Sequence, residues 1–204
     1  MKIIITESQY NRILKEEEEQ KVLHIPSLRV FGDDWYELQK FLESKGNPPY
    51  TIGGDLELSG TPIKSLGNLI SVGGNLGLRR TEIKSLGNFQ SVGGDLDLWD
   101  TQIKSLGNLI SVGGDLDLRY TPIKSLGNLT SVGGDLDLKY MPIKSLGNLQ
   151  SVGGDLDLWD TPIKSLGNLT SVGGNFDLRR TPLSKKYTQE DIRKMVDVGG
   201  YIFM

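Results

Sequence analysis

Aromatic and cationic residues recur in this sequence at two adjacent positions, at intervals of 20 residues. Trp, Tyr and Arg are the residue types that contribute most to the energy of protein–protein interfaces. Their concentration on one strip predicts a surface that binds a macromolecular partner. The candidate partner-binding residues are Arg79, Arg80, Trp99, Asp100, Arg119, Tyr120, Lys139, Tyr140, Trp159, Asp160, Arg179 and Arg180.

The same residues also complement one another if units 20 residues apart lie in neighbouring layers. Trp99 would then lie between Arg79 and Arg119, gaining roughly 0.5–1 kcal/mol from each exposed cation–π contact. Trp159 has the equivalent neighbours Lys139 and Arg179, and the carboxylates of Asp100 and Asp160 would face Arg80 and Arg180. Mutual pairing and partner binding are compatible, so both interpretations stay open.

Acidic residues occupy two further recurring positions, before and between the leucines of each unit. Stacked carboxylates about 5 Å apart repel by about 1 kcal/mol per pair in water. This repulsion could be offset by water and salt, by nearby Lys and Arg, or by bound cations such as Ca²⁺. We predict no dedicated metal site. These acids are Asp55, Glu57, Asp95, Asp97, Asp115, Asp117, Asp135, Asp137, Asp155, Asp157 and Asp177, with Asn75, Gly77 and Asn175 at the remaining places.

The inventory of reactive side chains argues against catalysis. The chain has no cysteine and one histidine, His24, so thiol chemistry and a Ser/His/Asp set within the repeats are excluded. Ser65 recurs in every unit and therefore suits a turn rather than a unique nucleophile. We expect a non-catalytic protein without a cofactor.

A repeat of 20 residues without insertions positions all of these side chains. In the first unit Leu56 and Leu58 alternate as in a strand with one buried face, whereas the glycine Gly67 disfavours a long helix over the following apolar positions. We expect a strand, a corner, and a turn or short 3₁₀ segment. One unit cannot bury its six apolar side chains, but a stack at roughly 4.8 Å per step can.

The repeat resembles the leucine-rich repeat family in its short bacterial or phage form of about 20 residues, and is similar to receptor L domain repeats. The residues that carry the resemblance in one unit are Leu136, Leu138, Met141, Ile143, Leu146, Leu149 and Val152. Thr stands where the family usually has Asn, and Gly133 where a leading Leu is expected, which leaves an arc or a straighter β-solenoid open. The resemblance implies a mainly β, right-handed stack of about seven coils that binds through its strand face.

The chain divides into four segments by composition. The sequence predicts a separate N-terminal helix over residues 1–22, an N-terminal cap over 23–50, the solenoid over 51–183 and a C-terminal cap over 184–204. Asp34 and Glu37 predict the start of a helix with the apolar residues Trp35, Leu38, Phe41 and Leu42. Thr188 and Asp191 predict the start of a second helix with Ile192, Met195 and Val196, ended by Gly199-Gly200.

Composition narrows the class of partner. The formal net charge of −3 argues against nucleic-acid binding driven by net positive charge. Without a signal-like or membrane-spanning apolar stretch we expect a cytoplasmic protein that binds no membrane. The first ten residues look like an opening found on tailed-phage proteins, which would also permit a virion. We therefore expect a protein-binding module, or alternatively a structural or assembly component such as a virion or scaffold protein.

Overall fold

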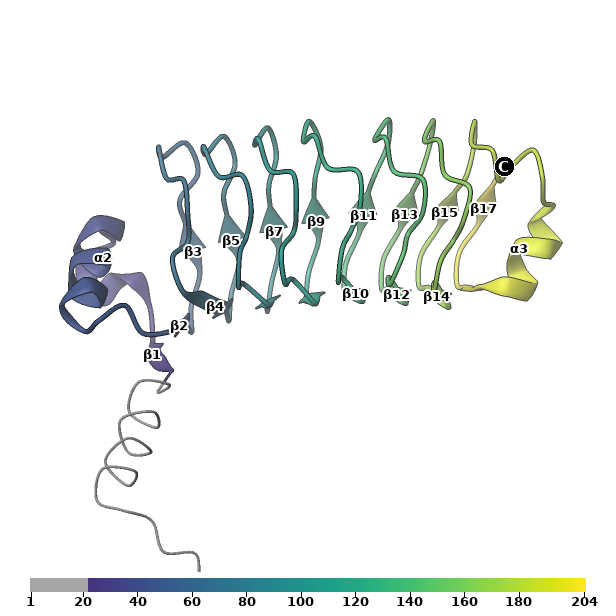
Figure 1. Cartoon of the computed structure of the whole chain (residues 1–204). Helices are drawn as coiled ribbons and strands as arrows, with labels where there is room; N and C mark the ends of the chain where they lie inside the picture. Colours follow the sequence, from purple (N-terminus) through teal and green to yellow (C-terminus); the bar gives the residue numbers. More distant parts are fainter. Residues whose placement is uncertain (1–21) are drawn as a thin grey trace, which may run out of the picture.

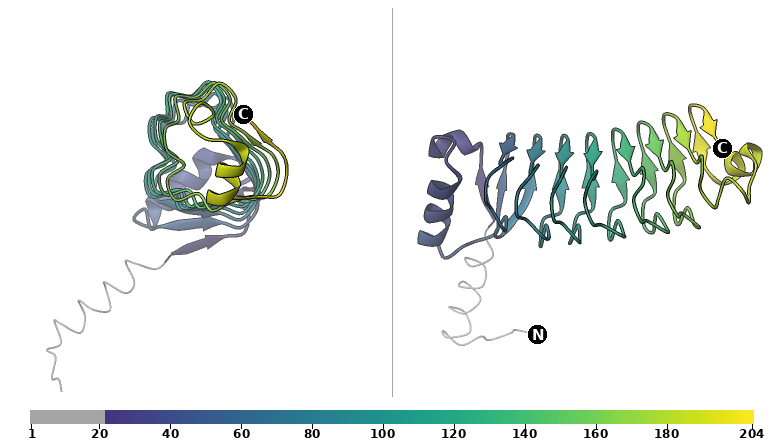
Figure 2. Two further views of the ribbon diagram at one scale, coloured as in Figure 1. Left: turned by 90° about the vertical axis from the view of Figure 1, so that its right-hand side faces the viewer. Right: turned by 90° about the horizontal axis from the view of Figure 1, so that it is seen from above.

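Stacked coils form a parallel β-solenoid that runs along a nearly straight axis (Figure 1). A computed structural model describes residues 22–204, and the helix predicted before residue 22 lies outside this range. Seen end-on, the successive coils superimpose on one another (Figure 2). The predicted solenoid of 20-residue coils with helices at both ends is confirmed, and its axis is straighter than an arc.

The leucine pairs form an eight-stranded parallel sheet, which we call the front sheet. Its register pairs residues that are 20 positions apart, as in Leu76 opposite Leu96, so each strand lies beside the equivalent strand of the next coil. The seven predicted strands are present, and the chain's last residues add an eighth. The strands are β3 (Leu56–Glu57), β5 (Leu76–Gly77), β7 (Leu96–Asp97), β9 (Leu116–Asp117), β11 (Leu136–Asp137), β13 (Leu156–Asp157), β15 (Phe176–Asp177) and β17 (Ile202–Phe203).

A second parallel sheet of nine strands, the back sheet, lies where we predicted only a turn or 3₁₀ segment. Its repeated strands are two residues long, too short for a two-residue alternation to stand out in the sequence. The back sheet contains β1 (Leu23–Ile25), β2 (Tyr50–Ile52), β4 (Leu69–Val72), β6 (Ser91–Val92), β8 (Ser111–Val112), β10 (Ser131–Val132), β12 (Ser151–Val152), β14 (Ser171–Val172) and β16 (Asp197–Val198).

A third side, without regular strands, closes each coil between the front and back sheets. Its backbone still pairs between coils, because the Lys104 N–H donates to the Lys84 carbonyl at 3.0 Å and Ser85 forms a bridge with Ser105. The Ser85 hydroxyl accepts the Gly87 N–H, and Gly87 has a φ of +60°, which favours glycine at this corner. The lysine of each unit is exposed on this side.

The core is a set of columns of identical side chains. Leu96, Leu98, Ile103, Leu106 and Leu109 of one coil are all buried, as are their equivalents along the stack, except Leu166, which is only partly buried. The threonine column is buried beside them from Thr81 onward, and its hydroxyls donate to the carbonyl three residues earlier. This satisfies a polar group that the core would otherwise leave unpaired.

The N-terminal helix α2 (Trp35–Ser44) covers the first coil (Figure 1). The Asp34 carboxylate accepts the N–H groups of Tyr36 and Glu37, as expected for a helix cap. The short 3₁₀ helix η1 (Leu28–Phe31) precedes it. Trp35, Leu38 and Leu42 are buried, so they replace the missing preceding coil.

At the other end α3 (Gln189–Met195) begins with the predicted capping box between Thr188 and Asp191. One detail of the prediction is wrong, because the helix ends at Met195, which is 45% exposed, and not at Gly199-Gly200. The glycine pair instead joins β16 to β17 in a further coil, in which these strands pair with β14 and β15. The Arg193 guanidinium donates to the carbonyls of Val198 and Gly200, which no following coil covers.

Among residues 22–204, none of the helices has the length and apolar character needed to cross a bilayer.

Candidate binding surface

The twelve predicted site residues lie just after the front strands, two in each of six coils. We call them the front strip. One buried leucine separates each pair from its strand, and both positions of the pair lie in the turn that leads toward the lysine side. Because the front sheet is in register, the equivalent residues of successive coils form two parallel columns. The structure thus brings the predicted residues together.

Every residue of the second column has a left-handed backbone. The φ angles are +55° for Arg80 and Asp100, +60° for Tyr120 and Tyr140, +56° for Asp160 and +58° for Arg180. This conformation is uncommon for residues with a Cβ atom. The first unit has Gly60 at this place with a φ of +71°, which is the one signal in the sequence that indicates it.

The two tryptophans are flanked partly by different residues from those predicted. Arg79 lies over the Trp99 ring, as predicted, with 5.4 Å from Cζ to the ring centroid, and Arg80 is closer at 4.5 Å. On the other side Tyr120 contacts Trp99 edge-on, with centroids 5.9 Å apart, whereas the predicted neighbour Arg119 is turned to Asp117. The left-handed turn directs the second column over the ring of the adjacent coil.

The second tryptophan has the same surroundings in the opposite order along the stack. Tyr140 contacts Trp159 edge-on at 4.7 Å, and the Arg180 guanidinium lies 5.1 Å from the ring centroid. The predicted neighbours Lys139 and Arg179 instead contact carboxylates. The strip is therefore symmetric in residue type about the gap between the coils of Tyr120 and Tyr140.

Five acids on the outer face of the front sheet pair with the cations of the strip; we call them the inner acids. They are Asp97, Asp117, Asp137, Asp157 and Asp177. Arg79 reaches Asp97 at 2.6 Å in the next coil, and Lys139 pairs with Asp137 at 3.1 Å and Asp157 at 3.2 Å. Each inner acid also accepts the backbone N–H two residues later. Nearby cations are thus one of the offsets for the stacked charge.

The balance of these contacts is visible in the pKa of Asp117. Partial burial raises its pKa, but the side-chain and backbone hydrogen bonds from Arg119 outweigh burial, and the net pKa is lowered. For Lys139 burial lowers the pKa, and the hydrogen bond to Asp137 with the charges of Asp137 and Asp157 raises it overall. Asp117 and Lys139 are therefore each held in their charged form by their partners.

The other recurring acids form an acid ladder at the corner between the back and front sheets. Each Oδ1 accepts the backbone N–H of the equivalent residue one coil later; for example, Asp95 Oδ1 accepts the Asp115 N–H at 2.8 Å. The ladder consists of Asp55, Asn75, Asp95, Asp115, Asp135, Asp155 and Asn175, and it ends at the Tyr201 N–H. Within residues 22–204 no group of three His, Asp or Glu side chains is arranged to hold a metal ion.

A hollow of about 280 Å³ lies at the centre of the strip, between Tyr120 and Tyr140. Met141, the one residue that replaces threonine in its column, lines it with Thr121 and Pro142. Tyr120 is 76% exposed and Tyr140 65% exposed. Their rings thus form the walls of a partly apolar recess, with Arg119, Lys139 and Asp137 at its rim.

No family model, curated protein or solved structure matches this chain. The assignment of a function therefore rests on the geometry of the surface. Two residues that the sequence analysis did not include extend the strip. Phe203 lies beside Asp177 in the front sheet, with Arg179 5.2 Å above its ring, and Tyr201 contacts Phe203 with centroids 6.4 Å apart.

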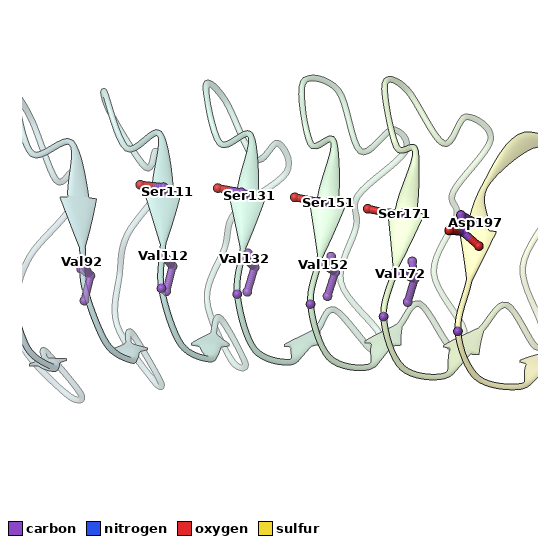
Figure 3. A pocket seen from close by; sticks show the side chains of 15 residues that line it. Val92, Ser111, Val112, Ser131, Val132, Ser151, Val152, Ser171, Val172 and Asp197 are labelled. Atoms are coloured by element: carbon purple, nitrogen blue, oxygen red, sulfur yellow. The ribbon is translucent and has the colours of Figure 1, made fainter.

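A larger, shallow groove of about 510 Å³ follows the back sheet (Figure 3). The serines of the back strands and the first glycine of each Gly-Gly pair line it, as in Ser131 and Gly133, with Asp197 at its end. Its glycines are explained by packing, because a Cβ on Gly133 would lie 2.0 Å from the Gly113 carbonyl oxygen. This groove is therefore accounted for by close coil stacking.

Proposed function

We propose that this protein is a non-catalytic binding module whose front strip binds a protein partner. The observation that carries the proposal is the central pair of Tyr120 and Tyr140, which are exposed on either side of the hollow. Tyr, Trp and Arg are enriched among residues that dominate binding energy, and such residues cluster near the centre of an interface. The strip has this composition and this arrangement.

The rigidity of the strip supports the same function. Trp99 contacts Arg80 and Tyr120, so its ring is held before any partner arrives. Arg79, Arg119 and Lys139 are likewise held by the inner acids. A surface that is ordered in advance loses less side-chain entropy on binding, which otherwise costs about 0.5–1.5 kcal/mol per immobilised side chain.

The resemblance to leucine-rich repeats supports binding through the strand face, although the straight axis and the second sheet differ from an arc-shaped member of that family. His24 lies on β1 beside Thr51, at the N-terminal end of the back sheet, and takes no part in the strip. The proposed partner is therefore recognised by aromatic packing and paired charges, without a reaction.

Affinity capture from the native host tests this proposal. The Tyr120→Ala/Tyr140→Ala variant should lose at least about tenfold in affinity for a captured partner, equivalent to about 1.4 kcal/mol. The matched control is Tyr36→Ala, because Tyr36 is an exposed tyrosine (57%) on α2, away from the strip. Equal loss in both variants, or no loss in the double variant whose thermal transition is unchanged, would contradict the proposal.

A structural or assembly component, such as a scaffold or virion protein, is the second candidate function. Two rows of exposed charge along the stack support it, namely the acid ladder and the lysines of the third side, because the front strip uses neither of them. A cytoplasmic or virion setting fits either function.

A further inference from the structure

A row of lysines follows the third side of the solenoid, one in each coil. The lysine row consists of Lys64, Lys84, Lys104, Lys124, Lys144 and Lys164, and all six are exposed. Of these six lysines, only Lys64 forms an ion pair with a residue in the range 22–204, namely Glu82 at 3.5 Å. The other five ammonium groups repel their neighbours one coil away, so a matching row of negative charge would stabilise them.

The acid ladder has the complementary properties. Asp55, Asp95, Asp115, Asp135 and Asp155 are exposed, and within residues 22–204 none of them forms an ion pair with a side chain. One oxygen of each carboxylate is fixed by the backbone N–H of the next coil. The ladder is therefore a rigid row of negative charge with about the same spacing as the lysine row, about 4.8 Å per coil.

The two rows lie on different sides of each coil and cannot pair within one molecule. From Asp95 the chain passes through β7 and the front-strip residues Trp99-Asp100 before it reaches Lys104. From Lys104 it passes through the Gly107-Asn108 corner and β8 before Asp115. A whole sheet thus separates the rows in either direction.

We propose that copies of this chain associate side by side, with the lysine row of one copy on the acid ladder of the next. The two rows share one period because each contributes one residue per coil, so a single alignment brings several ammonium and carboxylate groups together. The formal net charge of −3 opposes the approach of a polyanion such as nucleic acid, whereas the acid ladder of a second copy offers the lysine row a row of opposite charge with the same period.

The placement of the rows also determines the type of assembly. Each copy offers its lysine row on one side and its acid ladder on another, so a contact uses two different surfaces. Such heterologous contacts continue into open arrays unless a rotation closes them. The assembly therefore grows with concentration rather than stopping at a dimer, and it leaves the front strip of each copy accessible.

Sedimentation velocity on the full chain across salt and protein concentration tests this inference. At about 10 mM salt, where charges interact over roughly 30 Å, the weight-average mass should rise continuously with concentration; at about 1 M it should equal that of the monomer. A monomer under both conditions overturns the proposal. A mass that stops at two chains overturns the open arrangement.

Two neutralised variants identify the surfaces. Lys104→Gln/Lys124→Gln/Lys144→Gln and Asp95→Asn/Asp115→Asn/Asp135→Asn should each remain monomeric at low salt. The asparagines keep the ladder hydrogen bonds, as Asn75 and Asn175 do. The second variant has a formal net charge of 0, which favours non-specific association, so its loss of assembly would be specific evidence.

Assembly that persists in both variants overturns the proposal. A second outcome also overturns it: only the lysine variant loses assembly, wild type binds single-stranded DNA in a salt-dependent way, and the lysine variant does not. That outcome would assign the lysine row to polyanions. Tyr120→Ala/Tyr140→Ala should assemble as wild type does, and both neutralised variants should retain partner capture. Failure of this inference is therefore distinguishable from failure of the proposed function.

Discussion

The Oδ1 atom of Asp115 accepts the backbone N–H of Asp135, one coil later, at 2.7 Å. This bond recurs from coil to coil and replaces a strand ladder at the corner between the two sheets. It explains why an acid or asparagine, and no other type, occupies this position in the seven units from Asp55 to Asn175.

Asp115→Asn should therefore leave the free energy of unfolding within about 0.5 kcal/mol of wild type, since the amide oxygen still accepts the bond. Asp115→Ala should lower it by about 1 kcal/mol, the typical net contribution of one hydrogen bond. Urea denaturation of both variants measures the difference. Equal losses in the two would mean that the carboxylate's charge, and not its acceptor oxygen, matters.

Gly134 leaves the space in which the Asp115 carboxylate lies. A Cβ at Gly134 would be 2.0 Å from Asp115 Oδ1 and 2.8 Å from the Gly114 carbonyl carbon, and backbone cannot move away as a flexible side chain can. Gly134→Ala should lower the free energy of unfolding by about 3 kcal/mol. Gly60→Ala is the comparison, because a Cβ there meets no atom within 4 Å and only its φ of +71° is unfavourable.

The left-handed second column predicts a gain in stability. Asp160, at a φ of +56°, should become more stable by about 0.5–1 kcal/mol on Asp160→Gly, as Gly adopts this conformation without strain. Asp160→Val should lower stability by about 1–2 kcal/mol, because β-branching disfavours positive φ. Thermal unfolding monitored by circular dichroism measures both. A loss on the glycine substitution would show that the Asp160 side chain makes a contact more valuable than the relief of strain.

Asp117 should contribute to loss of stability in acid. Its pKa in the folded protein lies below 3.8, so the unfolded chain binds protons more readily than the folded protein does. Its contribution is present above pH 3.8 and is lost as the pH falls through the lowered value. Asp117→Asn should reduce the slope of the unfolding free energy against pH in that range, measured by urea titrations at a series of pH values. An unchanged slope would contradict the pairing with Arg119.

The period of the sequence predicted which residues are neighbours. Because no residue is inserted between Leu96 and Leu116, or between Trp99 and Arg119, any regular stack places such pairs in adjacent coils. The helix caps at Asp34 and Thr188 were equally predictable, since a cap depends on residues within one turn of the chain.

The back strands and the aromatic contacts could not be predicted in this way. A strand two residues long, such as β8 (Ser111–Val112), is formed by hydrogen bonds to the coils on either side and has no local pattern of its own. The left-handed turn at Arg80 and Tyr120 directs these side chains toward Trp99, and the sequence indicates this turn only through Gly60 in the first unit.

The sequence by itself determined the columns, because identical units of constant length can stack in only one register. The tertiary structure alone decided where each column faces and what it contacts. It placed the carboxylates against backbone N–H groups, the tyrosines beside the hollow and the lysines on a side of their own. The reason is that the direction in which a column of side chains points depends on the backbone angles at each corner, and these angles are set by the contacts between coils.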